Sequence, residues 1–232
     1  MALTEPMAAP KARIARRSRF DRLFGGGTDG NEQLTAVTAV ILLALFAVLG
    51  LTIVFIGQLL WLHLFLGVLL VGPVAVKMAS TGYRFVRYYT SNPAYRRKGP
   101  PHPLMRFLGP FVVLSTVGVF LTGLVLLIDG PSAGSLVRFL HKATFIAWLG
   151  AVGIHVLWHL IELPHSLRAV QRAQRSDRGA RGSSRYVPGS TGRSLLLLSS
   201  AVGGLVLAIA FLPQIDSWTA GLAHHVYHLQ LH

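Results

Sequence analysis

Residues 34–56 read LTAVTAVILLALFAVLGLTIVFI, and after Gly57 and Gln58 residues 59–79 read LLWLHLFLGVLLVGPVAVKMA. At 1.5 Å per residue, each stretch is long enough to cross a hydrocarbon layer of about 30 Å as a helix. Helices are expected because lipid offers no hydrogen-bond partner to an open sheet edge. The two stretches therefore predict a pair of transmembrane helices.

Three further apolar stretches cover residues 107–128, 136–163 and 194–212, and they end at the turn signal Asp129-Gly130-Pro131, at Pro164 and at Pro213. The chain is 52% hydrophobic and only 13% charged, which is unlike a soluble domain. The expected fold class is all-α, an integral membrane bundle of five transmembrane helices within residues 34–212. A disordered basic arm (1–33) is expected before it, and a histidine-rich tail (213–232) after it.

The basic residues predict the direction of these spans. Of the 22 Lys and Arg, six lie in the N-terminal arm, seven between residues 77 and 106, and seven between residues 168 and 193. Only Arg138 and Lys142 lie at the opposite end of the bundle. The positive-inside rule then gives a cytoplasmic N-terminus and an exported C-terminus, as in a multi-pass protein of a plasma membrane, here a bacterial inner membrane.

The same distribution bears on partners and cofactors. A net charge of +14 is compatible with nucleic-acid binding, but the cations flank apolar stretches, so the expected partner is the lipid bilayer and no nucleic acid. The chain has no cysteine, which excludes disulfides, cysteine-ligated iron–sulfur clusters and thiol catalysis.

Two histidines fall at one depth on different spans. His63 lies one turn inside the exported end of the second span, and His141 lies about one turn inside the same end of the fourth. Ionisable residues inside a membrane are costly and are treated first as functional. Two imidazoles facing each other across a helix bundle are the axial ligands that a b-type haem requires, so we expect His63 and His141 to bind haem iron.

The fourth span also contains His155 and His159, fourteen and eighteen residues after His141 and on the same helical face. One interpretation is a second, inner haem that uses His155 or His159 together with His102. Lys77 is the residue of the second span at that depth, and it is not an expected haem ligand. The alternatives are a metal ion held by the pair at i and i+4, or histidines hydrogen-bonded in the protein core.

The C-terminal tail is rich in histidine. In a helix, three of its histidines share one face and a fourth lies beside them, namely His224, His228, His232 and His225. Such a cluster suits Zn²⁺ or Cu²⁺, and an amphipathic helix lying on the outer leaflet explains the segment equally well.

Residues 140–164, LHKATFIAWLGAVGIHVLWHLIELP, resemble the haem-bearing helix of membrane cytochrome b subunits, of which those of formate dehydrogenase and nickel–iron hydrogenase are the nearest type. The resemblance covers the second to fourth spans. It implies a bundle with two b haems, one helix giving a ligand to each, and places His63, His141 and His155 as ligands. The chain departs from that pattern in lacking a fourth ligand within a span and in having a fifth helix of no evident redox content.

These features together predict a b-type cytochrome that passes single electrons between a redox partner and the quinone pool of a respiratory chain. One haem b is expected, with a second as the open alternative. The chain would act as an electron-transfer subunit of an oxidoreductase, beside other redox subunits or an exported electron-transfer protein, and not as a stand-alone enzyme. The competing prediction is a non-redox membrane subunit or a divalent-metal-handling protein that uses the intramembrane and tail histidines.

Overall fold

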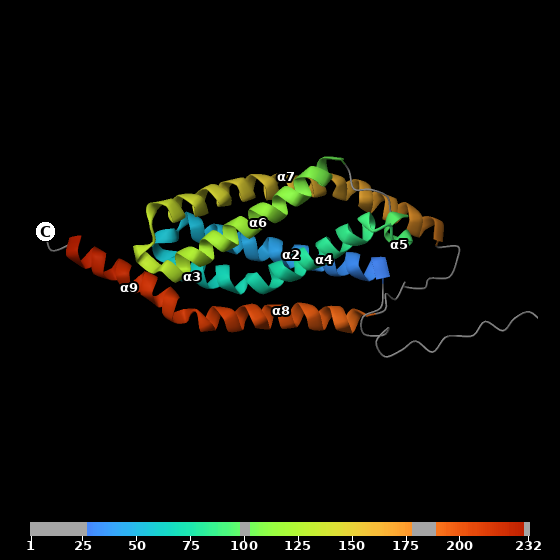
Figure 1. Cartoon of the computed structure of the whole chain (residues 1–232). Coiled ribbons are helices and arrows are strands. Elements are labelled where there is room, and N and C mark those ends of the chain that lie inside the picture. Colours follow the sequence, from blue (N-terminus) through green and yellow to red (C-terminus); the bar gives the residue numbers. More distant parts are fainter. Residues whose placement is uncertain (1–26, 98–102, 178–188, 230–232) are drawn as a thin grey trace, which may run out of the picture.

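The structure is a computed structural model that describes residues 27–97, 103–177 and 189–229; within these ranges, only the backbone of 162–177 and 221–229 is described. The described residues form helices and contain no strand (Figure 1). The helices are α2 (Gly27–Val54), α3 (Ile56–Leu69), α4 (Val71–Tyr89), α5 (Pro93–Arg96), α6 (Pro103–Asp129), the 3₁₀ turn η1 (Gly130–Ser132), α7 (Ser135–Asp177), α8 (Ser190–Ala210) and α9 (Leu212–Leu229).

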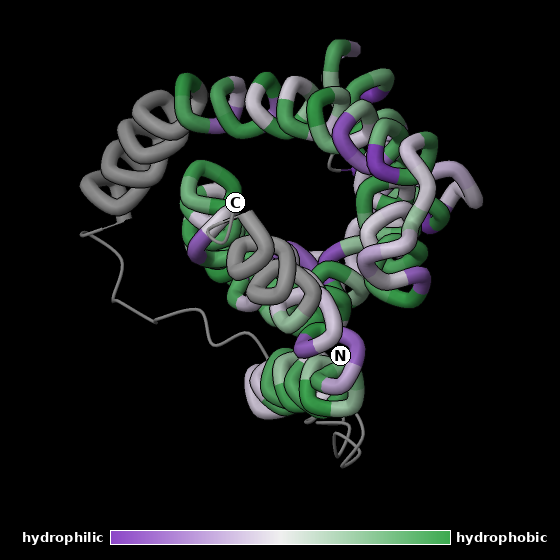
Figure 2. The backbone as a smooth tube through the Cα atoms, turned by 90° about the vertical axis from the view of Figure 1, so that its left-hand side faces the viewer, coloured by the Kyte–Doolittle hydropathy of each residue, from purple (hydrophilic) through white to green (hydrophobic). Residues whose placement is uncertain are grey.

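Five helical segments of the described chain are long and apolar enough to cross a membrane: Gly27–Val54, Ile56–Tyr89, Pro103–Ser132, Ser135–Ile161 and Ser190–Ala210. Most residues along these helices are hydrophobic (Figure 2), and many large apolar side chains are exposed, among them Phe107 at 81% and Leu114 at 70%. Such surfaces are unfavourable in water and favourable against lipid tails. The expected all-α, five-span fold is confirmed, and the chain is a multi-pass membrane protein.

Several helix boundaries differ from those expected. Helix α2 begins at Gly27, so residues 27–33, which we expected to belong to a disordered arm, are helical; residues 1–26 lie outside the described part. The first turn-back runs from Phe55 to Leu59, both of which have non-helical backbone angles, and it contains the expected break at Gly57-Gln58. Helix α7 continues through Pro164 to Asp177, because a proline removes a single backbone hydrogen bond and a long helix tolerates that loss.

The bundle has two chemically different ends. One end, here called the η1 end, contains the α2–α3 turn, η1 and the start of α9. The other, here called the basic end, contains α5 and the first residues of α2 and α8. Arg193 donates to the Gln33 side chain at the basic end, at 2.8 Å, and the Trp61 indole donates to Asp216 at the η1 end, at 3.1 Å. Polar contacts thus join helices distant in sequence at both ends of the apolar layer.

A polar network joins α2 to α4 within the bundle. Lys77 Nζ donates to the backbone oxygen of Thr35 at 2.9 Å, and the Thr35 hydroxyl donates to Ser80 Oγ at 3.1 Å. The Asn31 side chain donates to the backbone oxygen of Ser80 at 3.2 Å. These bonds satisfy polar groups that would otherwise face hydrocarbon at substantial cost.

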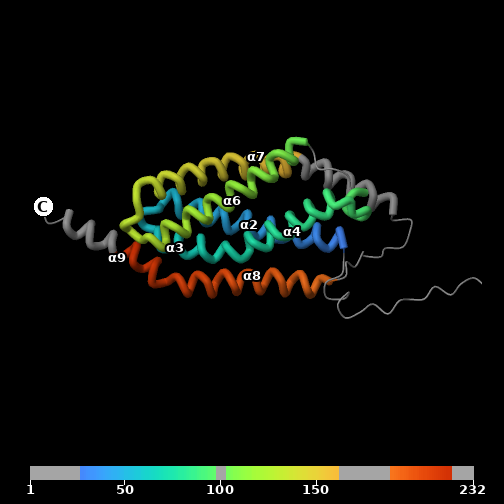
Figure 3. Tube along the Cα trace, in the orientation of Figure 1, coloured from blue at the N-terminus to red at the C-terminus, as the bar shows by residue number. Residues whose placement is uncertain are grey.

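Helix α8 runs alongside α3 and α4 (Figure 3), and two glycines set its distance from them. A Cβ built on Gly72 would overlap the backbone of Ser200, and one on Gly204 would overlap the backbone of Leu69. Small residues allow this close approach, which is the usual basis of helix association in membranes.

Substituting Gly204 by alanine is therefore expected to force α8 away from α3 and to destabilise the bundle by about 1–3 kcal/mol. Gly203→Ala is the matched control, because a Cβ at Gly203 meets nothing within 4 Å. Thermal unfolding of both variants in one detergent measures the difference. Equal melting temperatures for the two variants would show that the contact at Gly204 does not stabilise the fold.

Candidate functional site

His63 is held by a threonine of the neighbouring span. Its Nδ1 lies 2.9 Å from Thr52 Oγ1, and Thr52 is fully buried in α2. The Thr52 hydroxyl donates its single proton to the backbone oxygen of Leu49. With the hydroxyl proton placed on Leu49, the hydroxyl accepts a hydrogen bond from His63 Nδ1–H, and this is the tautomer that we assign to His63.

His141 is held in the same way by α6. Its Nδ1 lies 3.1 Å from Thr122 Oγ1, and the Thr122 hydroxyl donates to the backbone oxygen of Gly118 at 2.8 Å. The His141 ring therefore carries its hydrogen on Nδ1 as well.

The Nδ1–H tautomer that we assign to both histidines leaves the Nε2 lone pair available. Metal-bound histidines in proteins have this arrangement, in which one ring nitrogen donates to an outer partner and the other binds the metal. The arrangement occurs twice in this chain, on two different pairs of helices.

The two rings belong to one region of the bundle. Helix α3, which contains His63, contacts α6, and α6 in turn holds the His141 ring through Thr122. A Cβ added at Gly67, one turn further along α3 from His63, meets nothing within 4 Å. Gly123 of α6 packs against the His141 ring, because a Cβ added at Gly123 would lie only 3.1 Å from the ring carbon Cε1.

Helix α7, which contains His141, is fixed to the rest of the bundle by Trp148. The Trp148 indole donates to the Thr116 hydroxyl of α6 at 3.1 Å, and its ring meets Phe46 of α2 edge-on at 4.9 Å between centroids. Trp148 is buried, and its rigid ring contributes a large contact area. The rotation of α7 about its axis, and thus the direction of His141, depends on these contacts.

His155 and His159 form a second cluster further along α7. Their ring centroids are 4.7 Å apart and the ring planes are inclined at 71°. His155 Nδ1 is buried and has no hydrogen-bond partner among the described residues. Lys77 of α4 lies near enough to His155 for their charges to interact. At the depth of His155, here called the inner level, the residue of α4 is Lys77. It follows His63 by fourteen residues, as His155 follows His141.

Several expected ligands fall where the structure gives no side chains. His102 lies outside the described residues, as does His232. His224, His225 and His228 lie in α9, in the part where only the backbone is described. Among the described side chains, no group of three or more histidine, cysteine or acidic residues is placed to hold a metal ion. The pair His155–His159 has no third ligand there.

Thr52 and Thr122 are functional candidates that the sequence did not reveal. Threonine is common in apolar spans, and neither one stands at a helical spacing from the histidine that it contacts. The one available signal is that each lies in the span that precedes its histidine along the chain. That signal applies equally to Thr116, which bonds Trp148 instead.

Comparison of the chain with protein-family models, with curated proteins and with solved structures finds no match in any of the three.

Proposed function

We propose that the protein is a b-type cytochrome of a bacterial plasma membrane, with one haem b held between His63 and His141. It transfers single electrons between a redox partner and the quinone pool, as a subunit beside other redox proteins. The observation that supports this most is the shared anchoring of the two imidazoles, each with Nδ1 at 2.9 or 3.1 Å from a threonine hydroxyl that also bonds a backbone oxygen of its own helix.

The residues present fit a haem better than a bare metal ion. A zinc site needs three or four protein ligands, and the described side chains offer no such group. A haem brings four nitrogens of its own and needs two axial ligands, which His63 and His141 supply. In the tautomer assigned to both histidines, the Nε2 lone pairs are available to bind iron.

In this function the protein would position the haem and set its reduction potential. The haem, when bound, supplies the one-electron chemistry of its iron. His63 and His141 would fix the iron's axial ligation, and Thr52 and Thr122 would hold both rings in the binding tautomer. The surrounding apolar side chains exclude water, which strengthens the effect of each nearby charge and hydrogen bond.

We propose a single haem because the residues at the depth of His155 do not supply a second histidine from α4. Lys77 occupies the position that a histidine would need there, and its ammonium donates to the backbone of Thr35. A second haem would need His155 or His159 together with His102, and the quinone remains the partner proposed for electron exchange. The direction of the chain proposed from the basic residues places the haem near the exported surface.

A second candidate function rests on a separate observation. The His155 and His159 rings are in contact, and the buried Nδ1 of His155 has no partner within the described residues. A divalent metal bound there with a ligand from elsewhere would make the protein a metal-handling or non-redox subunit.

Colour separates the two functions. Protein purified from haem-replete cells is expected to show a Soret band and, after reduction, the sharp α-band of a b-type haem. Pyridine haemochrome analysis is expected to give one haem per chain. A colourless preparation with stoichiometric zinc or copper would refute the cytochrome and support the metal-handling protein.

A further inference from the structure

Two basic residues lie outside the three basic segments, which are the N-terminal arm, residues 77–106 and residues 168–193. Arg138 and Lys142 lie near the start of α7, at the η1 end, whereas the other 20 Lys and Arg belong to those segments. Both flank His141, with Arg138 one helical turn before it and Lys142 directly after it. We propose that Arg138 and Lys142 bind the two propionate groups of the haem, an inference that rests on the proposed function.

The need for cations follows from the chemistry of haem b, which carries two ionised carboxylates. A carboxylate left in hydrocarbon costs several kcal/mol, so the propionates must reach water or a cation. A haem bound to His141 lies close to the η1 end, and the nearest aqueous surface is the one beside Arg138. Arginine binds carboxylates through two parallel N–H bonds, and lysine acts as a point charge.

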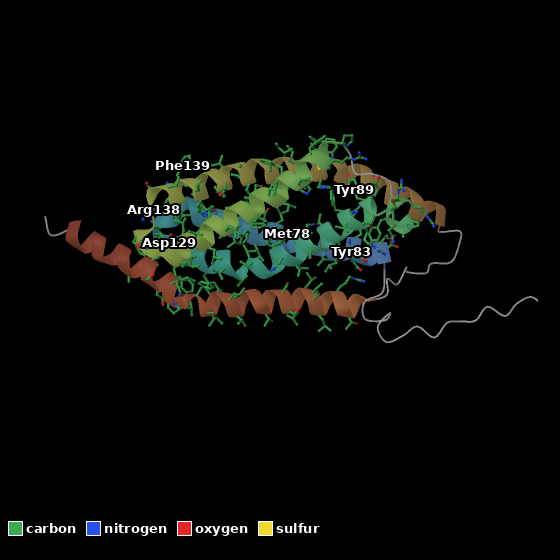
Figure 4. All side chains as sticks on the ribbon, in the orientation of Figure 1. Met78, Tyr83, Tyr89, Asp129, Arg138 and Phe139 are labelled. Atoms are coloured by element: carbon green, nitrogen blue, oxygen red, sulfur yellow. The ribbon has the colours of Figure 1, made fainter. Side chains whose placement is uncertain are left out.

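Both side chains are available for this role. Arg138 and Lys142 are exposed, and Figure 4 shows Arg138 at the same end of the bundle as Asp129. Within the described residues, neither forms an ion pair with Asp129 or Asp216, and Asp216 instead accepts from Trp61 at 3.1 Å. Arg138 donates one Nη2 bond to the backbone oxygen of Pro131, which leaves its other N–H groups for a ligand.

The Pro131 contact offers a purely structural explanation of Arg138, since it fastens α7 to η1. Lys142 makes no hydrogen bond in the described part of the chain, so that explanation does not extend to it. The experiment must therefore separate a loss of fold from a loss of charge pairing. Haem dimethyl ester, in which both propionates are neutral, provides that separation.

The test compares reconstitution of the haem-free protein in detergent with haem b and with its dimethyl ester. The double variant Arg138→Gln/Lys142→Gln is expected to bind haem b about tenfold more weakly than the unmodified chain, because it loses two exposed ion pairs with the propionates. It is expected to bind the dimethyl ester as well as the unmodified chain does. The midpoint potential of the variant with haem b should fall, because removing nearby cations favours the ferric state.

Arg193→Gln is the control. Arg193 is a half-buried arginine at the basic end that, like Arg138, donates to a neutral oxygen, here that of the Gln33 side chain, and its replacement should change neither affinity. Equal weakening with both porphyrins would overturn the propionate assignment in favour of a structural role. No weakening with either would overturn it as well, and the proposed cytochrome would still stand. Failure of the unmodified chain to bind haem b would overturn both proposals.

Discussion

Replacing either His63 or His141 by alanine is expected to abolish haem binding, with affinity reduced more than about 100-fold. Each substitution removes one of two axial ligands, whereas loss of an outer hydrogen-bond partner alone costs about 10–100-fold. The measurement is the haem-to-protein ratio after purification, by pyridine haemochrome. The two variants should behave alike, because both rings are held by equivalent threonine contacts.

The control for this prediction is His159→Ala, a histidine of the same helix α7 with an exposed side chain. It should retain haem at the ratio of the unmodified protein. Size-exclusion chromatography and circular dichroism show whether each variant is folded. Folded His63→Ala or His141→Ala protein with full haem content would contradict the assignment of the axial ligands.

Replacing Thr52 and Thr122 by valine is expected to have the next largest effect, about 10–100-fold weaker haem binding for each. Valine preserves the shape of threonine and removes the oxygen that accepts from Nδ1. Without that acceptor the imidazole is a less basic ligand and stabilises ferric iron less. The midpoint potential should therefore become more positive, as redox titration would measure.

Thr38→Val is the control, because Thr38 is fully buried in α2 but donates only to the backbone of Leu34 in its own helix, at 2.7 Å. It should leave haem affinity and potential unchanged. An equal shift in Thr38→Val and Thr52→Val would indicate a general loss of packing and not the loss of a bond to His63.

The sequence was sufficient to predict the five helices and the common depth of His63 and His141. Both follow from the length of apolar stretches, because the thickness of a bilayer fixes where each helix enters and leaves. Depth along the axis is then a matter of counting residues. The ligand role of the two histidines stays a prediction.

The sequence could not predict which side chains meet between helices. A membrane span is apolar around its whole circumference, so no polar face reveals its rotation about its axis. For that reason the contacts of Thr52 and Thr122 became apparent only in three dimensions. The same reason hides Gly72 and Gly204 among the other glycines of the spans.

The helix ends were predicted least well, because hydropathy reports where lipid begins and not where backbone hydrogen bonds end. Residues 27–33 are polar yet helical, and α7 extends beyond the apolar layer through Pro164 to Asp177. By contrast, the end of α6 at Asp129 agrees with the Asp-Gly-Pro turn signal, since η1 begins at Gly130 with φ of 69°, a conformation that glycine adopts without strain.

The most direct measurement of the central proposal is the electron paramagnetic resonance spectrum of the oxidised protein, integrated against protein concentration. Two neutral imidazoles on one iron predict a low-spin ferric signal corresponding to one centre per chain. A high-spin signal would mean that His63 and His141 do not both bind the iron, and the absence of any haem signal from haem-replete cells would contradict the cytochrome itself.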